Sequence, residues 1–92
     1  MTDWMVSLQQ QLTERTDPAR AGHVISRLLP QMLADMNRMA QKKKAGETLT
    51  EEYRLDDGSL SITLTGVCTG NGIDITNAAC EGKAHTSDRQ IR

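Results

Sequence analysis

The spacing of hydrophobic residues changes near residue 46, and this change constrains the fold more than any other feature of the chain. Before it, apolar residues recur about every 3.6 positions, which is typical of amphipathic helices. After it, apolar and polar residues alternate, which predicts strands with one buried face. The sequence therefore predicts a single α+β domain over residues 1–92, with a helical half (1–45) and a β half (47–80).

The helical half is expected to hold two helices. The first runs to about Arg15 and carries apolar residues at helical spacing: Trp4, Met5, Leu8 and Leu12. The second begins at Pro18, because Asp17 can cap it and proline is tolerated at the first helical position. We expect it to extend to about Lys44, with Gly46 near its C-terminal cap.

Pro30 lies inside the second helix. It cannot donate to the Ser26 carbonyl and clashes with it, so the helix should kink or break there. The apolar stripe nevertheless keeps one phase across the proline on a helical wheel: Ala21, Ile25, Leu28, Leu29, Met32, Leu33, Met36, Met39 and Ala40. We therefore expect one long bent helix. Two helices joined at Pro30 are the alternative.

Two dipeptides in the β half, Asp57-Gly58 and Asn71-Gly72, are strong signals for hairpin turns. With these pairs at the tips, Leu55 faces Leu60, Cys68 faces Ile75, and residue 80 faces residue 63. The same register collects the apolar residues on one face: Tyr53, Leu55, Leu60, Ile62, Leu64, Cys68, Ile73 and Ile75. The other face carries Glu52, Arg54, Ser61, Thr63, Thr65, Asp74 and Thr76.

These elements predict a three-stranded antiparallel meander, with the N-terminal helix and the long kinked helix packed on one of its faces. The tail, residues 83–92, is polar and holds one large apolar residue, Ile91. We expect the tail to be mobile, as termini often are. A short fourth strand is the alternative.

Few residues suit catalysis or metal binding. The two cysteines and two histidines are scattered, so no zinc site is expected, and Cys68 and Cys80 should both be free thiols, with Cys68 buried. Neighbouring carboxylates such as Glu51 and Glu52 point to opposite faces of a strand, so they do not form an acid–base pair. We expect no enzyme, no cofactor and no metal. The apolar runs are short and the N-terminus lacks a basic start, so we expect a cytoplasmic protein without membrane spans.

One helix face is unusually cationic. Residues 1–45 carry seven Lys/Arg and four Asp/Glu, although the whole chain has a net charge of −1. On the helical wheel Arg20, Arg27, Arg38 and Lys42 lie within about 60° of one another, opposite the apolar arc. Lys43 and Lys44 add a cluster of charge at the C-terminal end of the helix. The candidate partner-binding residues are Arg20, Arg27, Gln31, Arg38, Lys42, Lys43 and Lys44. A solvated outer face and the helix dipole offer an alternative explanation of these charges.

The opening MTDWMVSLQQQL, the run RLLPQMLADMNRMAQKKKAG and the chain length resemble small phage-encoded anti-CRISPR proteins that act on the type I-F surveillance complex. The resemblance implies a non-enzymatic inhibitor that docks on the crRNA-guided complex in the host cytoplasm. It would contact Cas backbone subunits, with crRNA as a further contact left open, and would block hybridisation of target DNA. The net charge near zero favours steric or guide-directed blocking over DNA mimicry.

Two other functions stay open. A small phage or plasmid transcription regulator would bind free duplex DNA. A protein–protein adaptor would dock a partner through its methionine-rich helix, since methionine suits adaptable interfaces. Core packing is the ordinary role of such a stripe, formed here by Met32, Met36 and Met39.

Overall fold

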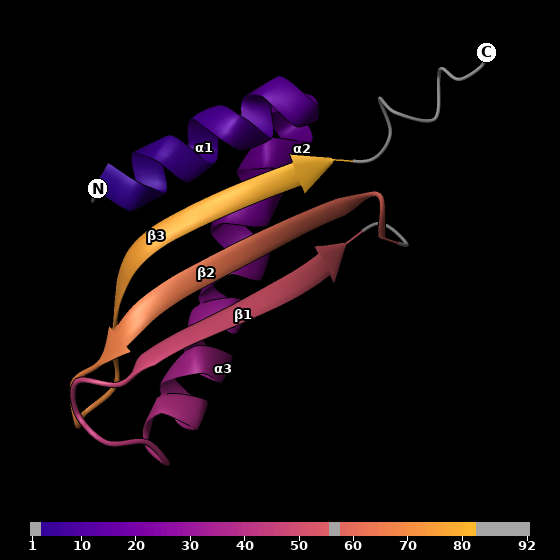
Figure 1. Cartoon of the computed structure of the whole chain (residues 1–92). Helices are drawn as coiled ribbons and strands as arrows, with labels where there is room; N and C mark the ends of the chain where they lie inside the picture. Colours follow the sequence, from indigo (N-terminus) through magenta and orange to yellow (C-terminus); the bar gives the residue numbers. More distant parts are fainter. Residues whose placement is uncertain (1–2, 56–57, 83–92) are drawn as a thin grey trace.

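The predicted α+β architecture is confirmed by a computed structural model, which describes residues 3–55 and 58–82. Two helical segments lie on one side of a three-stranded antiparallel sheet of order β1-β2-β3 (Figure 1). The elements are α1 (Asp3–Arg15), α2 (Pro18–His23), a π turn η1 (Val24–Leu28), α3 (Leu29–Ala40), β1 (Thr48–Leu55), β2 (Leu60–Cys68) and β3 (Ile73–Gly82). None of the helices in these ranges has the length and apolar character needed to cross a bilayer. The tail and the tip at residues 56–57 lie outside the described residues.

The start of the second helix follows the sequence signal. The Asp17 side chain accepts a hydrogen bond of 2.7 Å from the Arg20 N–H, and Pro18 takes the first helical position. This satisfies a backbone donor that would otherwise lack a partner at the helix end. The first helix ends at Arg15, as expected.

Pro30 is accommodated within a continuous helix rather than at a break. The π turn η1 ends at Leu28, two residues before the proline, and the Leu29 N–H donates to the carbonyl of Val24, five residues earlier. The wider turn replaces the regular α-helical hydrogen bonds next to Pro30, which has no backbone N–H to donate. Pro18–Ala40 therefore forms one helix of 23 residues, as expected, and not two helices joined at Pro30.

The π turn overturns the expectation that the apolar stripe keeps one phase. It adds a residue to one turn, so residues before it are rotated by about 100° relative to a regular α-helix. Val24, which is not part of the expected stripe, is fully buried, whereas Ile25 is only partly buried.

The helix also ends earlier than expected, at Ala40 instead of about Lys44. Gly46 does not cap it. Instead, Gly46 has φ +95° and donates its N–H to the Cys68 carbonyl at 2.8 Å, which ties the loop to the end of β2.

The β1–β2 register agrees with the prediction from Asp57-Gly58, with Leu55 opposite Leu60 and Tyr53 opposite Ile62. Asp57 itself lies outside the described residues, and Gly58 has φ +91°.

The β2–β3 turn differs from the expected one. Thr69 donates its N–H to the Gly72 carbonyl at 3.0 Å, so Gly70 and Asn71 form the tip and Cys68 pairs with Ile73 rather than Ile75. Gly70 supplies the positive φ, at +92°, that a two-residue hairpin needs at its first position.

A β-bulge in β3 shifts the register again. Between Thr65 and Gly66 the pairing skips one residue of β3, so Cys80 faces Ile62 instead of residue 63. The extra residue reverses which side chains of β3 point inward. As a result Ala78 and Cys80 are buried, and Cys80 joins Cys68 as a buried free thiol. The expectation that both thiols are free agrees with the structure.

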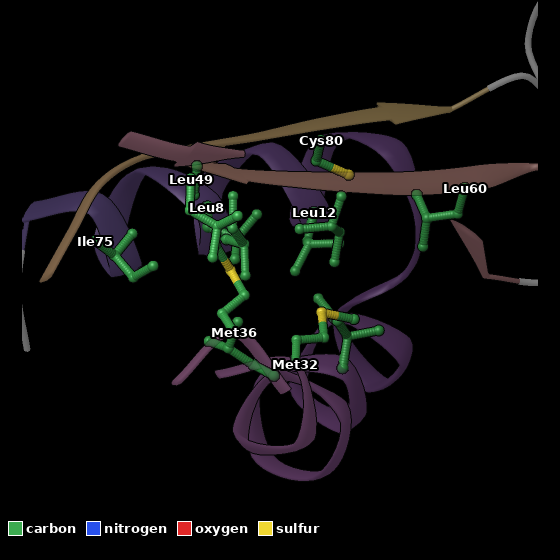
Figure 2. Packing of buried hydrophobic residues seen from close by; sticks show 14 of the residues in the cluster. Leu8, Leu12, Met32, Met36, Leu49, Leu60, Ile75 and Cys80 are labelled. Carbon is green, nitrogen blue, oxygen red and sulfur yellow. The ribbon is translucent and has the colours of Figure 1, made fainter. Parts of the chain in front are cut away.

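The core lies between the sheet and the helices and is built from aliphatic and sulfur-containing side chains (Figure 2). Leu8 and Leu12 of α1 and Met32 and Met36 of α3 contribute to it. The apolar face expected for the sheet is the inner face, although Tyr53, Leu55 and Ile73 are only partly buried. Each methionine of the stripe Met32, Met36 and Met39 is buried or partly buried, which favours a core role for this stripe.

Candidate anion-binding surface

The outer face of the long helix places Arg27, Gln31 and Arg38 in solvent. With the π turn taken into account, these three residues still project within about 20° of one another, away from the core. Arg20 precedes the π turn, which rotates it out of this row, and it is partly buried and makes an interaction of its own. The structure thus keeps Arg27, Gln31 and Arg38 together and separates Arg20 from them.

The Arg38 charge has a local partner. Its guanidinium contacts the Asp35 carboxylate at 2.6 Å, one turn away on α3. The other Asp35 oxygen accepts a hydrogen bond of 2.8 Å from the Tyr53 hydroxyl of β1. Burial, together with the Asp35 hydrogen bond and charge, raises the pKa of the Tyr53 phenol well above its ordinary value. Arg38 therefore takes part in a chain of contacts, through Asp35 and Tyr53, that joins helix and sheet. Because Asp35 neutralises part of its charge, Arg38 attracts an anion less strongly than an unpaired arginine does.

Lys42, Lys43 and Lys44 lie in the turn that follows α3, not on the helix. The N–H groups of Lys42 and Lys43 donate to carbonyls three residues earlier, Met39 and Ala40, at 3.1 and 3.0 Å. The Lys44 N–H donates to the Glu47 carboxylate at 2.6 Å. All three lysine residues are exposed. The turn thus displays three ammonium groups at the negative end of the helix dipole, where cations are favoured.

The cations form two groups rather than one continuous row. Arg27 lies thirteen positions before the end of the helix at Ala40, a rise of about 20 Å, and the lysine turn begins beyond that point. Gln31 accompanies Arg27, since its side-chain N–H donates to the Arg27 carbonyl at 3.3 Å. We define the cationic surface by the residues Arg27, Gln31, Arg38, Lys42, Lys43 and Lys44.

An open pocket of about 290 Å³ adjoins the Arg27 end of this surface. Its walls come from η1, α3 and the end of β1: Leu28, Gln31, Met32, Tyr53, Arg54 and Leu55. Neither this pocket nor the Asp35–Tyr53 hydrogen bond is predictable from the sequence, because both join residues at least 18 positions apart. No group of three His, Cys, Asp or Glu residues within 3–55 and 58–82 is arranged to hold a metal ion.

No family model, curated protein or solved structure matches this chain.

Proposed function

We propose that the protein is a non-catalytic inhibitor that binds a crRNA-guided type I-F Cas complex and blocks hybridisation of target DNA. In this proposal the cationic surface contacts guide-RNA phosphates and acidic side chains of Cas backbone subunits in the host cytoplasm. The observation that supports it most is the exposed lysine turn, Lys42–Lys44, together with the exposed Arg27 on the helix that precedes it.

The two groups of cations have different chemistry. Arg27 offers a planar fork that suits phosphate or carboxylate oxygens, while the lysine turn offers compact point charges. A helix length of about 20 Å between the groups covers several nucleotides of a backbone, so one strand is long enough to contact both. Aromatic stacking contributes little, because the chain has one Trp, one Tyr and no Phe.

The proposal can be tested with the double variant Arg27→Gln with Lys43→Gln. Both residues are exposed, and neither side chain has a hydrogen bond or ion pair among the described residues, so the variant should fold normally. Arg38 is left unchanged because it contacts Asp35. We expect the variant to inhibit target-DNA binding by the purified complex at least about tenfold less well, a reduction in binding free energy of about 1.4 kcal/mol.

A matched control is Gln9→Glu with Gln10→Glu, which lowers the net charge equally at exposed positions of α1. This control should inhibit like the unaltered protein. The salt dependence of binding should become shallower for the Arg27/Lys43 variant, by roughly 0.7 in logarithmic slope for each phosphate of a single strand that the variant no longer neutralises. Equal inhibition by the two folded double variants would contradict the proposed role of the cationic surface.

A further inference from the structure

The two edges of the sheet are treated differently. Along β3, side chains of α1 occupy the outward backbone groups. The Gln11 side chain accepts from the Cys80 N–H at 2.8 Å and donates to the Ala78 carbonyl at 3.2 Å. The Arg15 guanidinium donates to the Cys80 carbonyl at 2.6 Å. This edge is therefore closed to another strand.

The β1 edge is open. The Cys68 N–H donates to the carbonyl of Glu47, the residue opposite it in the β1–β2 register. In an antiparallel pair every second residue is hydrogen-bonded to the neighbouring strand, so this bond shows which residues of β1 bond to β2. Odd-numbered residues of β1 consequently bond to β2, and the backbone groups of the even-numbered ones point away from the sheet: Thr48, Thr50, Glu52 and Arg54. Among the described residues, no hydrogen bond reaches these outward N–H and C=O groups. Figure 1 shows β1 as the outer strand opposite the α1 side of the sheet.

The charges on this edge favour a second copy of the same strand. Glu52 and Arg54 lie on the exposed face of β1, two residues apart, with a nitrogen–oxygen distance of 3.6 Å. In an antiparallel pair of identical strands with the two-fold axis at Tyr53, Glu52 lies opposite the partner's Arg54, and the reverse pair forms as well. Both residues belong to the outward-pointing set, so each opposed pair can exchange two backbone hydrogen bonds.

The neighbouring registers are unfavourable. An axis at Glu52 places two identical carboxylates opposite each other, an axis at Arg54 places two guanidinium groups opposite each other, and an axis at Glu51 again opposes two carboxylates. Opposite charges across strands stabilise a pair, and like charges directly opposite destabilise it. Among these four axes within Glu51–Arg54, the one at Tyr53 places opposite charges across from each other.

We propose that the protein forms a two-fold symmetric dimer by antiparallel pairing of β1 with β1 of a second copy, centred on Tyr53, which extends the sheet to six strands. The self-complementary surface is what a two-fold interface requires. Charged residues can also serve to keep an edge strand from pairing. In β1, however, their signs and spacing make the self-pairing favourable.

Sedimentation of the full chain over about a hundredfold range of concentration tests this proposal, because a dimer's population depends on concentration. We expect a monomer–dimer equilibrium. Arg54→Glu should weaken the dimer at least about tenfold, because it opposes carboxylates across the axis. The exchanged pair, Glu52→Arg with Arg54→Glu, should restore it. Amide hydrogen exchange should show protection of the Glu52 and Arg54 N–H groups that increases with protein concentration.

Several results would overturn the proposal: a monomer at every concentration, a dimer unaffected by Arg54→Glu, or no recovery in the exchanged pair. Capture of an extended segment of another protein on β1 by a protein that stays monomeric would assign the edge to a different partner and overturn it too. Glu52→Arg alone provides a second test if Arg54→Glu does not fold, and circular dichroism checks the folding of each variant.

Discussion

Replacing Gln11 should destabilise the protein much more than its position on a helix surface suggests. Gln11→Ala leaves the Cys80 N–H without its acceptor and the Ala78 carbonyl without its side-chain donor. Removing two hydrogen bonds to partly buried backbone groups should cost about 2 kcal/mol, at about 1 kcal/mol each. For a domain of this size, that corresponds to a fall in Tm of roughly 10 °C.

Urea unfolding followed by fluorescence of the single tryptophan, Trp4, measures this change, since Trp4 packs against the core. Gln10→Ala is the control: Gln10 is exposed and its side chain has no hydrogen bond within the described residues, so its effect should stay within about 0.5 kcal/mol. Hydrogen exchange at the Cys80 amide should accelerate in Gln11→Ala alone. If the two alanine variants unfold at the same urea concentration, Gln11 does not protect the β3 edge in the way described.

Two further predictions concern the sheet. Tyr53 is the only tyrosine, so an absorbance titration should show the phenol ionising at higher pH in the native than in the unfolded protein. Because the native pKa is the higher one, this group's contribution to stability is fully present below the ordinary tyrosine pKa and is lost as the pH rises above it. Tyr53→Phe should remove this contribution. Equal native and unfolded titrations would contradict the burial of the phenol and its hydrogen bond to Asp35. Gly66→Ala should destabilise the protein by about 1–3 kcal/mol, because the added Cβ would lie 2.7 Å from the Asp74 carbonyl oxygen beside the bulge; an unchanged urea midpoint would contradict this packing.

Short sequence patterns were sufficient to predict the larger features of the fold. The Asp17-Pro18 pair set the start of the long helix through a cap, and the alternation around Asp57-Gly58 set the β1–β2 register. These features depend on residues close in the chain, so propensity and pattern describe them well.

The prediction of the β2–β3 turn was wrong because a contact with a distant residue decides between two turns that the local sequence allows. Gly70-Asn71-Gly72 allows two overlapping two-residue turns. The Asn37 side chain of α3 accepts a hydrogen bond of 2.9 Å from the Ile73 N–H, and it lies only 2.8 Å from the place of a Cβ at residue 72. This contact fixes the turn from across the molecule and could not be inferred from the turn sequence alone.

The candidate site was predicted in part for the same reason. Arg27 and Gln31 are exposed, as a helical wheel suggests, and the lysine run is exposed because the helix ends before it. The wheel assumed an uninterrupted α-helix, so it placed Arg20 in the row and extended the helix through Lys42. The π turn that moves Arg20 arises from how Pro30 is accommodated, and the local sequence left open whether the helix would bend, break or widen there.

The most direct test of the proposed function is a binding measurement with the unaltered protein. Purified type I-F complex, free crRNA and free duplex DNA would each be titrated with the protein at a fixed, stated salt concentration, since charge-driven affinities depend on salt. We predict saturable binding to the assembled complex and at least about a hundredfold weaker binding to either free nucleic acid. Equal or tighter binding to free duplex DNA would instead favour a transcription regulator, and no binding to the complex would contradict the proposed inhibitor outright.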